Sequence, residues 1–416
     1  MPNQNLMNKS GVKQINLKTK LNTKIKYYVK NIKISGFRNH DKVELDLTSD
    51  HVVLYGKNGI GKTNILEAIS FLNPGRGLRR ARSKDIFFKS SKSDKIYNTF
   101  WGVNADIVTP KGIFNVGSGS EHKKSSRLTK INSIVSNQTE LSQIFKVSWI
   151  TPQMLLLFHT SMNEKRRFLD RLVNYFNPLH ITYIYKYEKY SRERSRLINQ
   201  FKKDDLWLES LENSILDLAF LITKNRNLLL SELNEMFCNN LDNKSLLDSF
   251  PALEVYLKGE IETLLATEEE DYIKKKLLNI LKQNRKNNAT YFPGPHNSSI
   301  DILNRVSQKE ISFCSTGEQK LMLISLVLNH SKLLDVLYDV PPILLLDDIV
   351  EHLDEFNKNI LFNETANYKS QCWFTSTNLK FFENYPKNCN RIQLGTLTKK
   401  VNINKEYMYA WKNKKS

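Results

Sequence analysis

A glycine-rich stretch early in the chain leaves little freedom in how the residues around it can fold. It consists of Gly56, Lys57, Asn58, Gly59, Ile60, Gly61, Lys62 and Thr63. The stretch matches the pattern G-x-x-x-x-G-K-[ST], which requires a buried strand before it and a helix after it. Residues 51–55 are mostly apolar and of strand length, and apolar residues at helical spacing follow as far as Pro74. The sequence therefore predicts a strand, loop and helix unit of an α/β fold.

The chemistry of this stretch predicts a phosphate-binding loop. Its glycines allow backbone N–H groups to wrap around phosphates, and the helix N-terminus adds positive charge. We expect all eight residues of the loop to contact ATP, with the Lys62 ammonium reaching the β and γ phosphates as a catalytic group. The Thr63 hydroxyl is expected to bind Mg²⁺.

A second chemical pattern lies where the apolar stretch 343–346 ends in two carboxylates, Asp347 and Asp348. An aspartate at the end of a buried strand suits the ligand shell of Mg²⁺, and a neighbouring carboxylate can orient the attacking water. We assign Asp347 to the metal and Asp348 to the water. Taken alone, the pattern also fits a strand with a polar end, but the phosphate-binding loop in the same chain favours the catalytic interpretation. Residues 372–375 are expected to form a neighbouring strand.

The segment 315–319 has two interpretations. Ser315, followed three residues later by Glu318 and then by an apolar helix, predicts a capping box at a helix start. A serine, Gly317 and free N–H groups at a helix N-terminus can also form an anion site. On these residues alone the cap is the simpler interpretation, and a second phosphate-facing element remains open.

The pattern of apolar residues indicates an α/β domain with an inserted, mainly helical second domain. Between residues 208 and 222, leucines and isoleucines step by three and four, which suits one helix packed on another. We interpret this seam as core packing rather than as a partner-binding face. The expected divisions are a flexible basic extension at 1–26, an ATPase domain in two parts at 27–150 and 291–416, and a helical domain with a helical hairpin at 151–290.

Composition limits the cellular setting and the partners. The formal net charge of +19 indicates a polyanionic partner, for which nucleic acid is the natural candidate, although a lysine- and asparagine-rich composition explains the excess equally well. The four cysteines have no paired C-x-x-C spacing, so neither a zinc site nor a disulfide framework is indicated. Apolar runs fall far short of the roughly 20 residues of a spanning helix, and residues 1–40 lack the apolar block of an export signal. We expect a cytoplasmic protein without a membrane segment.

The motifs occur in the order found in ABC-type ATPase heads: the phosphate-binding loop, the S-x-G-E segment, the two carboxylates, and then residues 351–354. Within that superfamily the chain resembles the RecF family of bacterial recombination and repair proteins. The resemblance extends from about residue 28 to residue 395. Further segments that carry it are 35–40, 74–81, 166–172 and 294–296.

The resemblance implies a site shared between two heads of an ATP-dependent homodimer. Ser315, Gly317 and Glu318 would contact the nucleotide bound to the partner subunit, and Asp354 would be the aspartate of the D-loop. Gln153 would occupy the Q-loop position and contact ATP.

The chain departs from the family pattern in three places. Asp348 stands where many heads have a glutamate, which suggests slow turnover. No histidine occurs in 375–378, where many heads carry a switch residue, and 297–299 lacks the usual charges. Arg38 and Arg79 are weaker candidates for phosphate contacts, since a solvated loop charge explains each equally well.

The function that the resemblance implies is a weak, ATP-gated DNA clamp of recombinational repair and replication. Such a protein binds single-stranded or gapped DNA, works with RecR-type and RecO-type partners, and assists recombinase loading and the SOS response. The alternatives are a transporter ATPase subunit and an SMC-like chromosome ATPase. The long separation of Thr63 from Ser315 speaks against the first, and the modest length of the helical domain speaks against the second.

Overall fold

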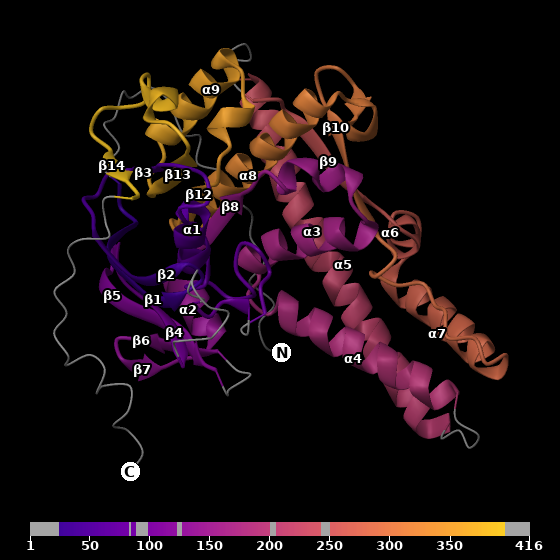
Figure 1. The fold of residues 1–416 in the computed structure, drawn as a ribbon. Coiled ribbons are helices and arrows are strands. Elements are labelled where there is room, and N and C mark those ends of the chain that lie inside the picture. Colours follow the sequence, from indigo (N-terminus) through magenta and orange to yellow (C-terminus); the bar gives the residue numbers. More distant parts are fainter. Residues whose placement is uncertain are drawn as a thin grey trace, which may run out of the picture.

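The computed structural model describes residues 25–82, 85–88, 99–122, 127–199, 205–242 and 250–395. Figure 1 shows sheets with their covering helices and, beside them, an arm of long helices. The basic extension predicted at 1–26 lies almost wholly outside the described residues.

A parallel sheet carries the motifs found in the sequence. In spatial order its strands are β14 (Asn390–Gln393), β3 (Val52–Tyr55), β13 (Cys372–Ser376), β12 (Ile343–Leu346) and β8 (Val147–Ile150). All four neighbouring pairs are parallel. The strands predicted at 51–55, 343–346 and 372–375 are therefore confirmed, and the last two are direct neighbours.

Both faces of this sheet are buried, because successive side chains enter two different cores. Leu344 and Leu346 pack into a core shared with α8 (Thr316–Tyr338) and α9 (Glu355–Ala366). Ile343 and Leu345 pack on the other face, where α1 (Lys62–Ser70) lies. This explains the continuous apolar composition of β12.

An antiparallel sheet covers the α1 side. Its spatial order is β2 (His40–Asp46), β1 (Tyr28–Phe37), β4 (Phe100–Thr109), β5 (Gly112–Glu121), β6 (Leu128–Ile131) and β7 (Ile134–Val135). Helix α2 (Gln138–Ile144) follows it in the chain. The rings of Phe37, Phe71 and Trp101 pack edge to face with centroids 5.3 to 5.8 Å apart, which fixes the end of α1 on this sheet.

The helical arm begins after β8. It comprises the 3₁₀ helix η2 (Met154–His159), α3 (Met162–Phe176), α4 (His180–Ile198), α5 (Asp205–Asp242), α6 (Glu260–Leu265) and α7 (Glu270–Lys286). Helices α4 and α5 lie side by side (Figure 1). Leu208, Leu211, Ile215 and Ile222 of α5 are buried, so the interpretation of this seam as core packing is confirmed.

The mainly helical domain expected at 151–290 also contains one strand. Residues Leu253–Lys258 form β9, which pairs with β10 (Ser299–Asn304), and β10 pairs with β11 (Lys309–Glu310). The buried Leu253 and Val255 alternate with more exposed residues, which is the period of a strand. A single short alternation between helices is a weak signal, and its pairing partner lies more than forty residues further along the chain.

Buried ion pairs fix the arm. The guanidinium of Arg194 lies 3.0 Å from Glu212, and neither side chain has exposed surface. Arg226 donates bonds of 2.8 and 3.0 Å to the two carboxylate oxygens of Asp170, which joins α5 to α3. Such pairs specify one arrangement of helices, because leaving either charge buried without its partner would be costly.

Among the described residues, one helix, α8, is long and apolar enough to cross a membrane. Within its most apolar window, 67% is buried inside the protein. Its apolar character is therefore accounted for by packing in the core beside β12.

Candidate nucleotide-binding site

The phosphate-binding loop joins β3 to α1 in a conformation that needs its glycines. Gly56, Gly59 and Gly61 have φ values of 149°, 79° and 105°. A Cβ atom on Gly61 would lie 2.6 Å from Asn39 Oδ1, and one on Gly56 would lie 2.9 Å from the Leu394 carbonyl oxygen. The loop is thus held close to its neighbours, with its backbone free to face a ligand.

Lys62 points its ammonium into this loop. Its Nζ donates hydrogen bonds to the carbonyl oxygens of Gly56 (2.8 Å) and Lys57 (3.3 Å), and it lies 3.5 Å from Asn58 Oδ1. Lys62 is only 4% exposed. Phosphate oxygens fit such a cradle, because they can take over the role of these carbonyl acceptors for a buried cation.

Carboxylates meet the loop at the ends of β12 and β13. Thr63 Oγ1 donates a 2.8 Å hydrogen bond to Asp347 Oδ1, and Thr375 Oγ1 lies 2.8 Å from the same oxygen. The arrangement follows from the order of the parallel strands, whose carboxyl ends share one edge of the sheet. Asp347, predicted as a metal ligand, and Thr63 are therefore brought together.

The donor set at this point suits Mg²⁺. Burial raises the pKa of Asp347, and the Asp348 charge acts in the same direction, while hydrogen bonds from Thr375 and Thr63 and the charge of Arg79 act against them. A hydroxyl and a carboxylate are the hard oxygen ligands that Mg²⁺ prefers. A bound cation would also stabilise the ionised form of a carboxyl that burial destabilises.

Asp348 is held in an unusual backbone conformation. Its φ is 49°, in the left-handed region that few non-glycine residues adopt. Its N–H donates a 2.8 Å hydrogen bond to Thr375 Oγ1, and its Oδ1 lies 3.1 Å from the same hydroxyl. The half-buried carboxylate therefore has a fixed direction beside Asp347.

Glu351 is a site residue that sequence reasoning did not single out. Its Oε1 accepts hydrogen bonds from Ser376 Oγ (2.9 Å), Thr377 N (2.5 Å) and Thr377 Oγ1 (2.8 Å). Burial raises the pKa of Glu351, but these bonds and the charge of Lys62 hold it below its ordinary value. Glu351 thus occupies the end of β13, where the sequence lacks a histidine. Its place at the start of 351–354, three residues before the expected D-loop aspartate, is the signal that could have identified it.

The S-x-G-E segment starts α8 with the predicted capping box. Glu318 N donates to Ser315 Oγ (3.3 Å), and Ser315 N donates to Glu318 Oε2 (2.7 Å). Ser315 and Gly317 are exposed. Within the described part of the chain, the hydrogen bonds of Ser315 and Glu318 stay in this first turn and none reaches the phosphate-binding loop.

The two remaining predicted residues each directly precede a helix. Gln153 is exposed and follows β8, directly before η2. Asp354 is exposed and caps α9, where it accepts hydrogen bonds of 2.8 Å from Asn357 N and Nδ2. The bond from the Asn357 N–H is the main cause that lowers the pKa of Asp354.

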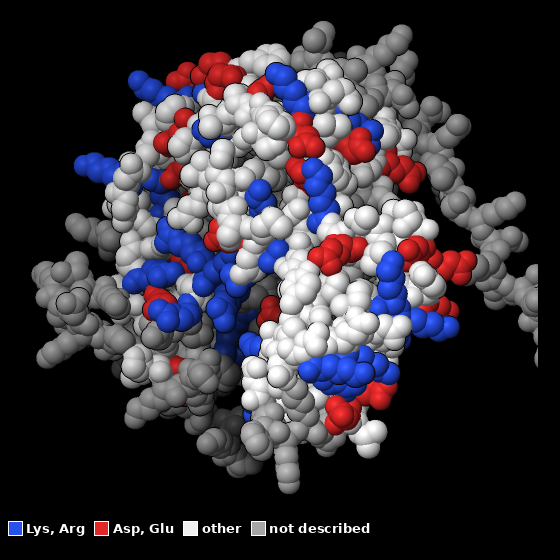
Figure 2. All heavy atoms as spheres, turned by 90° about the vertical axis from the view of Figure 1, so that its right-hand side faces the viewer, with Lys and Arg blue, Asp and Glu red and all other residues white. Residues whose placement is uncertain are grey.

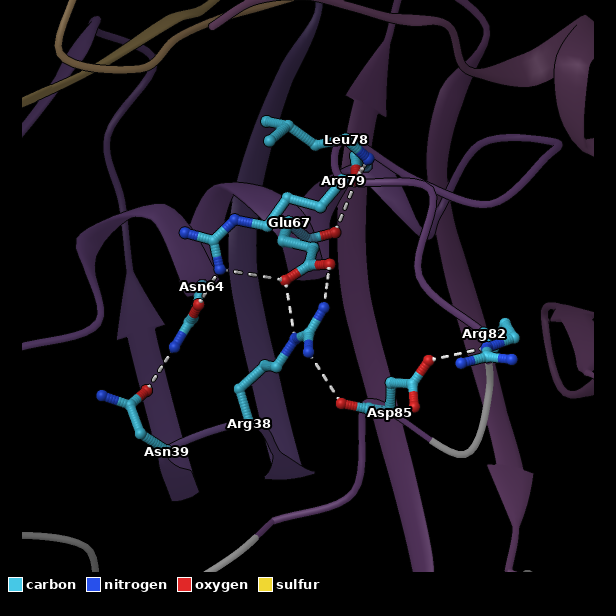
Figure 3. Close-up of polar contacts among 9 residues, drawn as sticks. Arg38, Asn39, Asn64, Glu67, Leu78, Arg79, Arg82 and Asp85 are labelled. Atoms are coloured by element: carbon cyan, nitrogen blue, oxygen red, sulfur yellow. Dashed lines mark hydrogen bonds and ion pairs between the residues drawn. The ribbon is translucent and has the colours of Figure 1, made fainter. Parts of the chain in front are cut away.

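Arg38 and Arg79 converge on Glu67, a residue of α1 with no exposed surface. Arg38 donates to both carboxylate oxygens at 2.9 and 2.7 Å, and Arg79 Nη1 lies 3.7 Å from Oε2 (Figure 3). Of the two alternatives left open for Arg38, the solvated loop charge is therefore excluded, because its guanidinium is anchored on Glu67. Arg79 is 40% exposed and remains open to a ligand.

Known proteins resemble this chain over most of its length. Residues 28–399 match the family described as RecF/RecN/SMC N terminal domain. A DNA replication and repair protein RecF from Rickettsia akari (strain Hartford) is 33% identical over 370 residues, which cover 88% of this chain and 99% of that protein. The chain belongs to the RecF family. The RecF protein of Brucella suis biovar 1 (strain 1330) is 32% identical over 362 residues, covering 85% of this chain and 91% of the relative.

Solved RecF structures show the same fold. The structure of the recombination mediator protein RecF-ATPrS in the RecFOR pathway matches with a TM-score of 0.73 at 22% identity, over 89% of this chain and 98% of that one. The RecF-ATP structure of the same pathway matches with a TM-score of 0.70. The expected fold, an α/β ABC-type head with an inserted helical part, is confirmed.

Proposed function

We propose that this chain is an ATP-dependent DNA-binding ATPase of recombinational repair and replication that closes as a homodimer around ATP. The observation that carries the proposal is the bond between Thr63 and Asp347, which joins the phosphate-binding loop to the carboxylates at the end of β12. This bond brings the phosphate-binding loop next to the carboxylates proposed to hold the metal and orient the water.

Within one subunit, residues 56–63 bind the phosphates, and the Lys62 ammonium neutralises charge on the β and γ groups. Thr63 and Asp347 hold Mg²⁺, which when bound offsets the negative charge of the phosphate oxygens. Asp348 orients the attacking water, and its fixed direction supports this role. Its arm is one methylene shorter than that of glutamate, which supports slow turnover and a weak ATPase.

The second half of the site comes from the partner subunit. Ser315, Gly317 and Glu318 present exposed or half-buried atoms at a helix N-terminus that is not bonded to the loop of its own chain. Such a helix N-terminus can bind the γ-phosphate of a nucleotide that is held by a second copy of the chain. Asp354 is also exposed and takes the same role, and Gln153 adds a contact to ATP from the segment after β8.

DNA binds through arginines that follow α1 and that lie on α3. Arg80 and Arg167 are both exposed. Burial lowers the pKa of Arg80, and the charge of the nearby Arg167 lowers it further. Burial lowers the pKa of Arg171 to about 10, and the charge of Arg80 contributes in the same direction. Figure 2 shows basic side chains gathered beside a hollow on the face that includes the arm. Clustered guanidinium groups suit a phosphate backbone rather than a base sequence.

The relatives named for DNA replication and repair support a choice of partners and setting. We infer that single-stranded or gapped DNA is bound, that RecR-type and RecO-type mediators cooperate, and that recombinase loading and the SOS response depend on the complex. The protein would act in the cytoplasm.

Mixing two inactive variants tests the shared site. Lys62→Ala removes the phosphate contact and Ser315→Arg blocks the α8 start with bulk and charge, so each homodimer should be inactive. A mixed dimer carries both lesions in one site and leaves the other intact. Since an equal mixture contains about one half mixed dimers, ATPase should return to about one quarter of the wild-type value.

The control places both changes in one chain. Mixed with wild type, this chain damages both sites of the mixed dimer and should suppress wild-type activity. If the single variants stay inactive although cross-linking shows that they pair, ATP binding to the mixed dimer is measured next. One bound nucleotide supports the shared site with coupled firing, whereas none contradicts it.

A further inference from the structure

Arg171 of α3 is a cation that lies among apolar side chains. The carbon of its guanidinium is 4.2 Å from the centroid of the Trp149 ring and 5.4 Å from that of the Phe168 ring. Its Nη2 lies 3.8 Å from the sulfur of Met154. Its Nε is closed off from solvent and has no hydrogen-bond partner in the described residues. Aromatic faces attract such a cation, but they replace only part of the hydration that burial removes.

No counter-charge balances this guanidinium within the part of the chain that the structure describes. Arg171 makes no ion pair there, and the neighbouring Asp170 is bonded to Arg226 instead. Burial lowers the pKa of Arg171 to about 10, and the charge of Arg80 acts in the same direction. Arg80 lies near a further exposed cation, Arg167. An anion that neutralised these two exposed charges would therefore make the burial of the guanidinium less costly.

The guanidinium packs on residues that adjoin the nucleotide-binding site. Trp149 lies on β8, where the carbonyl oxygen of the next residue, Ile150, accepts a 3.0 Å hydrogen bond from the Asp347 N–H. Met154 directly follows Gln153, begins η2 and packs against the cores on both faces of the parallel sheet. The positions of the Trp149 and Met154 side chains therefore affect where Gln153 and Asp347 lie.

We propose that Arg171 is a positioning residue that couples DNA binding to ATP binding within one chain. The proposal rests on the function proposed above and deepens it. Repulsion from Arg80 and Arg167 opposes the packed conformation of the guanidinium and populates one in which it turns out to solvent. DNA phosphates remove that repulsion, and the packed guanidinium then holds Met154 and the adjoining Gln153 in place for ATP. Since DNA and ATP favour the same conformation, each raises the affinity for the other.

Equilibrium titrations on the full chain in Mg²⁺ test the coupling. A slowly hydrolysed ATP analogue is titrated with and without a saturating gapped DNA duplex, and the duplex is titrated with and without the analogue. Ser315→Arg is present throughout, so that closure of the dimer does not contribute. In this parent chain each ligand should tighten the binding of the other by about fivefold, and linkage requires the two factors to be equal.

Arg171→Met removes the charge but keeps an unbranched side chain that can make the same apolar contacts. Without DNA, this variant should bind the ATP analogue about fivefold more tightly than the parent, and its coupling factor should fall below about twofold. Arg171→Ala removes the contacts as well, so it should lose the coupling without any gain in affinity. Without ligands, Arg171→Met should melt no lower than the parent, because a buried unpaired charge has been replaced, whereas Arg171→Ala should melt lower.

Arg80→Gln gives a second readout, which stands even if Arg171→Met folds poorly. It removes the repelling charge, so the affinity for the ATP analogue without DNA should rise by about twofold or more, although DNA binds more weakly. In the Arg171→Met background the same change should leave the affinity for the analogue unchanged, because its effect acts through Arg171.

A matched control is Arg192→Met, which makes the same chemical change at an exposed position of α4. It should leave the coupling factor at the value of the parent chain. This inference alone would be overturned by a parent that shows no coupling, or by an Arg171→Met variant that keeps the parental coupling or loses affinity as Arg171→Ala does. Failure of the wild-type chain to bind ATP or DNA would overturn the proposed function as well.

Discussion

Thr63 Oγ1 donates a 2.8 Å hydrogen bond to Asp347 Oδ1, although the two residues are 284 positions apart in the chain. We expect Thr63→Val to lose this bond and a hard ligand for Mg²⁺, so that ATP hydrolysis falls by about a hundredfold and requires more Mg²⁺. Thr63→Ser keeps the hydroxyl and should retain most activity. Rates measured across a Mg²⁺ titration check this, and equal behaviour of the two variants would remove Thr63 from the metal site.

Asp348→Asn should still bind ATP but hydrolyse it more slowly, because a neutral amide orients water less well than a carboxylate. The closed dimer should then last longer after ATP is added. Single-turnover hydrolysis and light scattering together measure both effects. Unchanged turnover would mean that another group positions the water, for which the half-buried Glu351, bonded to Ser376 at the end of β13, is a candidate.

Changing Arg80 and Arg167 together to Gln should weaken DNA binding and reduce its dependence on salt. Two lost phosphate contacts lower the slope of log affinity against log salt by about two. The matched control changes Lys275 and Lys286, two exposed cations of α7 on the outer arm (Figure 1). Gel shifts at several salt concentrations check the result, and an equal slope in both double variants would place the DNA elsewhere.

Stability should fall as the solution becomes acidic, because buried histidines resist protonation. Burial lowers the pKa of His330 to about 3 and that of His51 to about 4. The unfolded chain, with histidine near its ordinary value of about 6.5, binds more protons below that pH. The free energy of unfolding should therefore decrease from about pH 6.5 toward pH 4, by on the order of 1 kcal/mol per pH unit for each histidine.

His330→Gln isolates one part of this effect. Glutamine can still donate to the Leu172 carbonyl oxygen, which the His330 ring contacts at 3.1 Å. Denaturant unfolding across this pH range should give a shallower slope for the variant than for the wild type. Parallel curves would show that His330 is not the group being protonated.

Local patterns predicted much of the fold and the site. The phosphate-binding loop, the capping box at Ser315 and the strand before Asp347 each depend on residues close together in sequence, where periodicity and capping chemistry are informative. The contact between Arg38 and Glu67 spans 29 positions and depends on how a β-turn meets α1, which no local pattern encodes. The left-handed backbone conformation of Asp348 could likewise not be predicted from the sequence, since an aspartate at a strand end fits several conformations.

The order of the parallel sheet also bears on how the protein is made. The strand that carries the phosphate-binding loop, β3, has β13 and β14 as its two neighbours, and both come from the last part of the described chain. A nascent chain that has emerged only as far as β12 would leave both edges of β3 unpaired. Fragments released before β13 and β14 are made would therefore lack a formed loop, and ATP binding would begin only after both strands have been synthesised.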